Sequence, residues 1–209
     1  MKRIAVFASG GGTDFQSLID AVEDKKINGE IVLFIGNRKK AYSFVRAAEH
    51  GIHAEYINRK GFESYEAMDK AILGLLAEYR IDLLVLAGCL LQLGQNTVSA
   101  YHNRIMNIHP SLIPSFCGKG LYGTYVHEAV IAFGAKVSGC TVHFIDGDMD
   151  TGPIILQKSI EVLDNDTPQT LQAKVLKLEH ILLPKAVRLF CADRLIVEGR
   201  RVKILEDNV

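Results

Sequence analysis

The sequence predicts an α/β fold, with a mostly parallel, twisted, Rossmann-like sheet, helices on both faces and an antiparallel C-terminal portion. Short continuous apolar runs alternate with helical patterns through residues 1–100, as in buried parallel sheets. A glycine cluster directly follows the first apolar run, at a strand-to-helix turn. After residue 100 the alternation stops, and loops and longer strand patterns take over.

The first hundred residues contain four apolar runs of strand length. These expected strands are Ile4–Ala8, Ile31–Ile35, Ala54–Ile57 and Leu83–Ala87. Apolar residues at helical spacing connect them in three segments, Phe15–Val22, Ala41–His50 and Tyr65–Tyr79. Ser64 is the expected N-cap of the third helix. Because the strands are continuous rather than alternating, both faces of the sheet are expected to be covered.

The second half has a different organisation. Its expected elements are a brief strand over Ile105–Ile108, a loop over 110–123, a helix over Val126–Phe133, strands over Val137–Ile145 and Ile154–Val162, and a terminal hairpin of Leu195–Val197 and Val202–Leu205. A further helix begins at Asp166-Thr167-Pro168, and Pro184 is expected to kink or end it. We expect one domain over 1–209, with a phosphate-binding half at 1–100 and a catalytic half at 101–209.

Composition narrows the class of protein. Hydrophobic residues make up 48% and charged residues 23% of the 209, and 24 basic residues balance 24 acidic ones. Because the net charge is zero, no broad electrostatic field attracts nucleic acid or an anionic membrane. No apolar stretch reaches the 18 residues expected of a membrane-spanning helix. The four cysteines form no C-x-x-C pair. We expect a cytoplasmic protein, monomer or homodimer, that acts on small molecules without nucleic-acid or membrane partners.

The glycine cluster Ser9–Asp14 suits a phosphate, because glycines permit close backbone approach and the following helix start offers free N–H groups. The alternative is a tight turn without a ligand. A Walker loop is excluded, since no Gly-Lys-Ser/Thr follows. An NAD site fits poorly: Phe15 replaces the third glycine, and Asn37 and Arg38 stand where the ribose-binding acid belongs.

Asn107 and His109 are the most informative pair in the chain. They lie two residues apart, so in an extended segment their side chains share one face, and Pro110 favours that conformation at His109. An amide can stabilise a developing oxyanion, and an imidazole can move protons near neutral pH. The alternative is a structural histidine beside an Asx turn.

The acidic loop Asp146–Pro153 follows an expected strand. Calcium is rejected, because Thr151 and Gln157 occupy the positions that an EF-hand gives to glycine and glutamate. No histidine forms a metal-binding motif, so no metal is expected. The loop is either a solvated turn or brings one aspartate to His109, since a nearby carboxylate orients an imidazole.

Six blocks, in this order, resemble the folate-dependent formyltransferase family, specifically phosphoribosylglycinamide formyltransferases of purine synthesis: ASGGGTDFQSLIDA, GNRKKAYSFVRAAEHGI, LLVLAGCLLQL, MNIHPSLIPSF, GCTVHFIDGDMDTGPIILQ and LEHILLP. NIHPSLIP followed by DTGPI is the most specific part. The resemblance implies transfer of a formyl group from 10-formyltetrahydrofolate, as cosubstrate, to the amino group of glycinamide ribonucleotide.

The resemblance also implies site residues. The catalytic set would be Asn107, His109 and Asp150. The folate would contact Leu90, Leu91, Gln92, Leu93, Asn107, Asp146, Gly147, Asp148, Met149 and Asp150. The acceptor would contact Gly12, Thr13, Asp14 and Glu179. Similar proteins have a cis bond that corresponds to Ile113–Pro114.

The sequence departs from the family pattern at substrate contacts. Asp14 stands where asparagine is commoner, Tyr65 replaces an arginine, Leu176 replaces a glutamine of some members, and Cys117–Gly123 replaces the more typical proline-glycine loop. Two alternatives stay open: a 10-formyltetrahydrofolate hydrolase, and a non-catalytic folate- or nucleotide-binding module. Similar deformylases and methionyl-tRNA formyltransferases carry additional domains, which we do not expect here.

Overall fold

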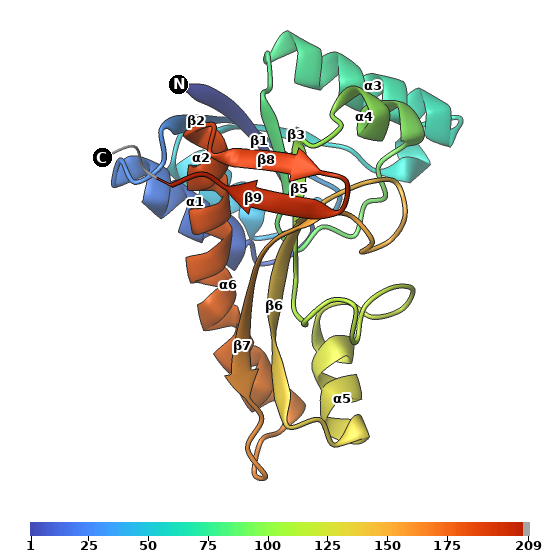
Figure 1. Cartoon of the computed structure of the whole chain (residues 1–209). Coiled ribbons are helices and arrows are strands. Elements are labelled where there is room, and N and C mark those ends of the chain that lie inside the picture. The colour runs from blue at the N-terminus through green and yellow to red at the C-terminus, as the bar shows by residue number, and fades with distance from the viewer. Residues whose placement is uncertain (207–209) are drawn as a thin grey trace. The chain divides into compact units, whose positions relative to one another are not determined.

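The computed structural model describes residues 1–206, and the chain forms two compact units, Met1–Met106 and Asn107–Val209. The first unit contains a parallel sheet in the order β3-β2-β1-β4 (Figure 1). Its strands are β1 (Lys2–Ala8), β2 (Gly29–Gly36), β3 (His53–Tyr56) and β4 (Leu83–Leu86). These are the four strands that the apolar runs predict.

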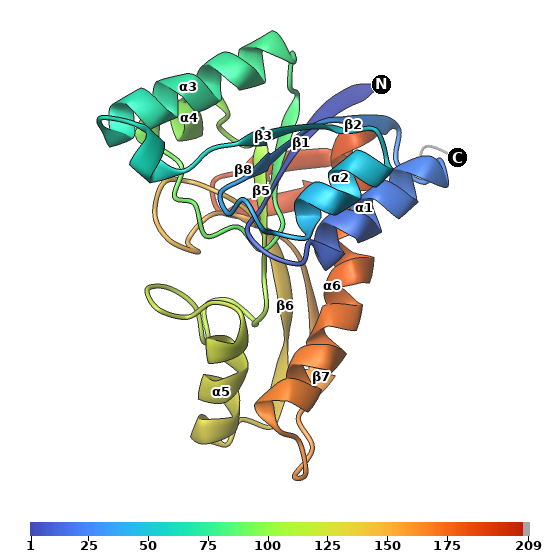
Figure 2. The same ribbon diagram turned by 180° about the vertical axis from the view of Figure 1, so that it is seen from behind.

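Helices cover both faces of this sheet. On one face lie α1 (Thr13–Glu23) and α2 (Ser43–Glu49), and on the other α3 (Tyr65–Glu78) and α4 (Gln95–Ala100), as the two opposite views show (Figures 1 and 2). A 3₁₀ turn, η1, spans Arg59–Gly61. This is the arrangement expected for right-handed crossovers. The Ser64 cap is confirmed, because its hydroxyl accepts a hydrogen bond from the Ala67 N–H at 3.0 Å.

A buried carboxylate fixes α4, which the sequence pattern did not predict. Asp69 of α3 is only 2% exposed and accepts hydrogen bonds from the backbone N–H groups of Asn96 at 3.1 Å and Thr97 at 3.3 Å. The Thr97 hydroxyl also donates to it. A Cβ at Gly94 would overlap the same carboxylate. Asp69 therefore satisfies the free donors at the start of α4 from another helix.

The second unit contains the antiparallel portion, with strand order β5-β6-β7-β9-β8. β5 (Ile105–His109) begins in the first unit and ends in the second. β6 pairs antiparallel with β7, and β8 with β9. The other elements are β6 (Val137–Phe144), β7 (Ile154–Glu161), β8 (Leu195–Glu198), β9 (Arg201–Ile204), α5 (Thr124–Phe133) and α6 (Pro168–Cys191). The predicted terminal hairpin is confirmed.

Of the two outcomes expected at Pro184, a kink or an end of the helix, the end is wrong, because α6 continues to Cys191. A proline removes one helical hydrogen bond and clashes with the preceding turn. Here that cost is offset by burial on both sides of the proline, since Leu182 and Leu183 before it and Ala186 and Val187 after it are buried. The helix begins as expected, with a capping box formed by Thr167 and Thr170.

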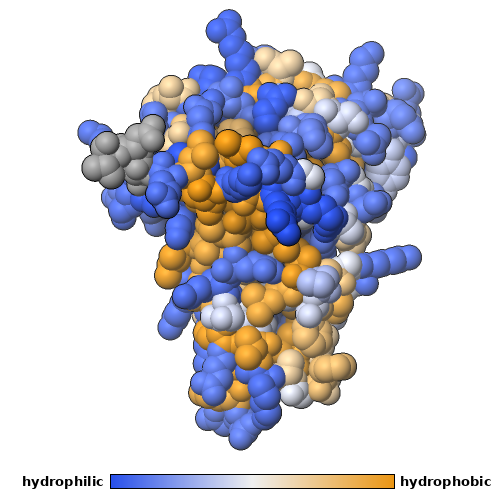
Figure 3. Space-filling model, viewed as in Figure 1, coloured by the Kyte–Doolittle hydropathy of each residue, from blue (hydrophilic) through white to orange (hydrophobic). Residues whose placement is uncertain are grey.

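The hairpin β8–β9 is only partly buried. Ile196 and Ile204 are 41% and 40% exposed, and hydrophobic side chains reach the surface of the second unit around these strands (Figure 3). Within residues 1–206, no helix is both long and apolar enough to cross a bilayer.

His127 of α5 lies in the core of the second unit. It is 1% exposed, and its Nδ1 atom has no hydrogen-bond partner among residues 1–206. Burial, with a smaller repulsion from His109, lowers the pKa of His127 to about 4. The side chain is therefore neutral at physiological pH, and its protonation opposes folding.

Replacing Asp69 with alanine should destabilise the protein by roughly 1–3 kcal/mol, because the start of α4 loses buried acceptors. Chemical denaturation measures the change in the free energy of unfolding. The control is Asp164→Ala, which removes only an exposed ion pair with Lys136 and should change the free energy of unfolding much less. Equal losses of stability in the two variants would contradict the proposal that Asp69 stabilises the start of α4.

The His127→Phe variant should lose less stability than the wild type on acidification. The unfolded imidazole takes up a proton near its ordinary pKa of 6.5, whereas the folded one does so only near about 4. Stability contributed by the neutral imidazole is thus lost between those values, by at most about 3 kcal/mol. The measurement is denaturation from pH 7 to pH 4, with exposed His102→Phe as control. If the stability of the wild type and of His127→Phe fell equally with decreasing pH, the prediction would be wrong.

Candidate active site

His109 occupies the last position of β5 and is 4% exposed. Its Nε2 atom lies 3.0 Å from the carbonyl oxygen of Phe116. A carbonyl only accepts hydrogen bonds, so Nε2 carries the hydrogen. The other ring nitrogen, Nδ1, lies 3.7 Å from Oδ2 of Asp150. The expectation that an aspartate of the acidic loop approaches His109 is confirmed.

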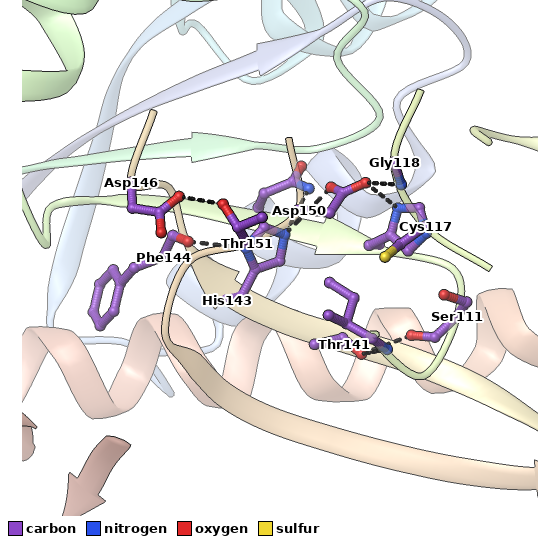
Figure 4. A network of polar contacts seen from close by, with 12 residues as sticks. Ser111, Cys117, Gly118, Thr141, His143, Phe144, Asp146, Asp150 and Thr151 are labelled. Carbon is purple, nitrogen blue, oxygen red and sulfur yellow. Dashed lines mark hydrogen bonds and ion pairs between the residues drawn. The ribbon is translucent and has the colours of Figure 1, made fainter. Parts of the chain in front are cut away.

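Asp150 lies between His109 and His143, and Figure 4 shows it beside His143 and Gly118. Its side chain is 10% exposed, and Oδ1 lies 3.7 Å from Nε2 of His143. The backbone N–H of Gly118 donates to Oδ2 at 2.9 Å. Asp150 itself has φ 57°, in the left-handed region that aspartate tolerates better than most residues. The turn at Asp150 therefore directs a largely buried carboxylate inward.

His143 is the site residue that the sequence analysis missed. It is fully buried on β6, and its Nδ1 lies 2.9 Å from the carbonyl oxygen of Phe144, so Nδ1 carries the hydrogen. Burial lowers the pKa of His143, which keeps the ring neutral. Nε2 is then an acceptor, and the Asn107 amide nitrogen donates to it at 3.1 Å. This bond fixes the amide orientation of Asn107.

The position of His143 in the sequence held a usable signal. It lies on a strand next to the acidic loop, seven residues before Asp150, where a buried histidine needs polar partners. Its pairing with Asn107 joins β5 to β6, two strands adjacent in the sheet. That pairing depends on strand register, which the sequence pattern alone did not specify.

The segment that follows His109 is fixed by Thr141. The Thr141 hydroxyl donates to the Ser111 carbonyl at 2.6 Å and accepts from the Ile113 N–H at 3.1 Å. Gln157 donates to the Ile113 carbonyl at 2.9 Å. The Ile113–Pro114 bond is cis, as expected. The segment leads to Phe116, whose ring packs edge-to-face on Phe133 and whose carbonyl binds His109.

The glycine cluster belongs to the first unit and joins β1 to α1. Gly12 is the N-cap of α1 with φ 68°, and a Cβ there would lie 2.8 Å from the Ser43 Cβ, so glycine is required. Two tethers hold the turn: Ser43 N–H donates to the Gly10 carbonyl at 3.2 Å, and Arg46 Nε donates to the Gly11 carbonyl at 2.9 Å. Such a preset helix start suits an anion.

Asp14 lies in the first turn of α1, and burial raises its pKa to about 6. The expected folate-lining residues Leu90, Leu91, Gln92 and Leu93 follow β4, also in the first unit. Glu179 belongs to the second unit, on α6, and is 7% exposed.

The acidic loop before Asp150 has one internal hydrogen bond, from the Thr151 hydroxyl to Asp146 at 2.7 Å. Met149 in this loop is 56% exposed. Within the described residues 1–206, no three His, Cys, Asp or Glu side chains are grouped to hold a metal ion.

Comparison with known proteins gives the family. The Formyl transferase family model matches residues 2–187. Phosphoribosylglycinamide formyltransferase of Bacillus subtilis (strain 168) is 36% identical over 188 residues, which are 90% of this chain and 94% of that protein. Glycinamide ribonucleotide transformylase 1 from Symbiobacterium toebii superposes with a TM-score of 0.93 at 40% identity, and the match covers 99% and 95% of the two chains.

Other relatives are longer than this chain. Chloroplastic phosphoribosylglycinamide formyltransferase of Arabidopsis thaliana is 38% identical, and the match covers 67% of it; the share falls to 66% for the Vigna unguiculata protein and 20% for the bovine trifunctional purine biosynthetic protein. A formyltetrahydrofolate deformylase from Pseudomonas syringae shares the fold at 22% identity. The fold, the family model and the closely matched relatives agree, and the chain belongs to the formyl transferase family, together with the phosphoribosylglycinamide formyltransferases.

Proposed function

We propose that this formyltransferase of purine biosynthesis moves the formyl group of 10-formyltetrahydrofolate directly to the amino group of glycinamide ribonucleotide. The observation that carries the proposal is the grouping of Asn107, His109 and Asp150 in one unit, with 3.7 Å between the imidazole and the carboxylate. A primary amide, an imidazole and a carboxylate suit acyl transfer through a tetrahedral intermediate.

Asn107 is placed to stabilise the oxyanion of that intermediate. One N–H of its amide is engaged by His143, which leaves the second N–H for the substrate oxygen. A donor held in position before the reaction stabilises the developing charge without reorganisation during the reaction. Neutral His143 therefore acts through Asn107, as a positioning residue.

His109 supplies the second stabilising group. Since Nε2 donates to Phe116, Nδ1 is the ring nitrogen that faces Asp150. The carboxylate orients the ring and stabilises positive charge that develops on it during the reaction. His109 can therefore stabilise the oxyanion and transfer a proton.

The reaction balances without a covalent bond between the enzyme and either substrate. The acceptor amine attacks the formyl carbon and forms the new C–N bond. A proton then passes from the resulting ammonium to N10 of the folate, with His109 as relay, and the carbon–N10 bond breaks. Holding both substrates together supplies a large part of the acceleration.

Substrate contacts are assigned by the family resemblance together with local geometry. We assign the acceptor phosphate to the backbone N–H groups of Gly12, Thr13 and Asp14, because the Asp14 carboxylate would repel it, and the remainder of the acceptor to Glu179. The folate is assigned to 90–93 and 146–150. The first unit then holds the phosphate loop and the folate segment 90–93, and the second holds the folate segment 146–150, Glu179 and the catalytic residues. A cytoplasmic location stays a prediction, as does the choice between monomer and homodimer; the Arabidopsis relative is named chloroplastic.

A hydrolase is the alternative, since the deformylase from Pseudomonas syringae shares the fold. Incubation with 10-formyltetrahydrofolate, with and without glycinamide ribonucleotide, separates the two reactions by spectrophotometry and mass spectrometry of the products. Transfer predicts folate release that depends on the acceptor, with one formylated acceptor per folate. Release at the same rate without the acceptor would favour the hydrolase, and ligand binding without turnover a non-catalytic module.

Replacing Asn107 or His109 with alanine should lower kcat by about 10²-fold or more, the scale of losing an oxyanion donor or a general acid. Substrate binding should change much less, because both groups act mainly in the transition state. Steady-state kinetics test this, with exposed His102→Ala as the control. Near-normal kcat in both site variants would exclude the assignment.

His143→Phe should lower kcat by about 5–10-fold, the value of one hydrogen bond that orients Asn107. His143→Gln, which restores an acceptor, should recover part of the loss. KM for both substrates and the thermal unfolding midpoint are measured in parallel, since a purely structural role would move the midpoint in both variants equally. Unchanged kcat in His143→Phe would show that Asn107 needs no such partner.

A further inference from the structure

Two loops leave the sheet of the first unit side by side. The glycine cluster follows β1, and the segment 88–94 follows β4, which pairs in parallel with β1. The pairing continues past the strands, where the Ser9 N–H donates to the Gly88 carbonyl at 3.1 Å. Because both loops follow carboxyl ends of parallel strands, they emerge at the same edge of the sheet.

The Ser9 side chain connects these loops. Its hydroxyl accepts a hydrogen bond from the Leu90 N–H at 2.8 Å. Ser9 as a whole is buried, with 2% of its surface exposed. The hydroxyl also contacts the thiol of the half-buried Cys89, which in turn accepts from the Leu91 N–H at 3.3 Å. Ser9 thus binds one loop through its side chain and begins the other through its backbone.

Ser9 also lies at a switch point of the sheet. β1 has β2 on one side and β4 on the other, and the chain returns from β3 through α3 to reach β4. In open α/β sheets, ligands bind outside the carboxyl ends of strands at such a point. The bridge made by Ser9 is therefore where two ligands on the two loops would influence one another.

We propose that Ser9 is a positioning residue that couples the two loops, so that the phosphate-bearing acceptor and the folate donor bind with positive cooperativity. This rests on the proposed function, which assigns the phosphate to the glycine cluster and the folate to 90–93. Ser9 itself contacts neither reacting group.

The coupling follows from how each loop is anchored. The glycine cluster is tied to α2 by Ser43 and Arg46, and the far end of the second loop is clamped by Asp69 next to Gly94. Between these anchors, the hydroxyl of Ser9 joins the two backbones. A ligand that fixes one loop also fixes the Ser9 hydroxyl and the Leu90 N–H. The second ligand then binds with a smaller loss of conformational entropy in the other loop, and the effect is reciprocal.

The test is calorimetric titration of the full chain with tetrahydrofolate and with glycinamide ribonucleotide, each in the absence and presence of the other. In the wild type, each ligand should tighten the other's Kd by about fivefold or more, the lower range of measured couplings. In Ser9→Ala, that factor should fall to about one and the folate Kd should rise. Ser99→Ala, an exposed serine of α4 in the same unit, is the matched control and should keep the wild-type factor.

Two results overturn the proposal: a wild-type coupling factor retained in Ser9→Ala, or a factor of one in a wild type that turns over normally. If Ser9→Ala fails to fold, Ser9→Cys keeps the shape with a poor acceptor, and the same two results apply to it. A wild type that binds neither ligand and has no transfer activity would instead refute the proposed function.

Discussion

Burial of the Asp150 carboxylate is the constraint on which the site depends. A largely buried carboxylate needs nearby polar partners, and here these are the Gly118 N–H at 2.9 Å and the imidazole of His109, whose Nδ1 lies 3.7 Å away. Burial keeps the other neighbour, His143, neutral. One carboxylate therefore faces two histidines with different tasks: His109 pairs with it, and His143 orients the amide of Asn107.

The polypeptide around the site maintains this difference. The left-handed turn at Asp150 directs the carboxylate inward, and the segment fixed by Thr141 brings the carbonyl of Phe116 to His109 and the N–H of Gly118 to Asp150. The loop with the unusual sequence, Cys117–Gly123, begins beside these backbone contacts. Backbone groups make them, so this loop can differ from the family pattern in side chains while it keeps the catalytic geometry.

The fold follows from patterns that the sequence contains locally. Apolar runs predicted every strand of the first unit, and the spacing of Asn107 and His109 predicted a shared face. What the sequence pattern did not predict depends on contacts between distant segments. Asp69 looks like an ordinary polar residue of an amphipathic helix until α4 is placed against it. Likewise, the sequence pattern did not show that α6 continues past Pro184, where burial on both sides stabilises the helix. The role of His143 required the register of β5 against β6, and the bridge at Ser9 required β1 beside β4.

The most direct test of this account is the protonation state of the two site histidines, measured by ¹⁵N NMR on protein with labelled histidine. We predict that at pH 7 His143 is neutral with hydrogen on Nδ1 only, and that it stays neutral below pH 6.5, while Nε2 of His109 carries hydrogen throughout. A His143 protonated on both nitrogens at pH 7, or on Nε2 alone, would contradict it, because Asn107 would then have no acceptor to orient its amide.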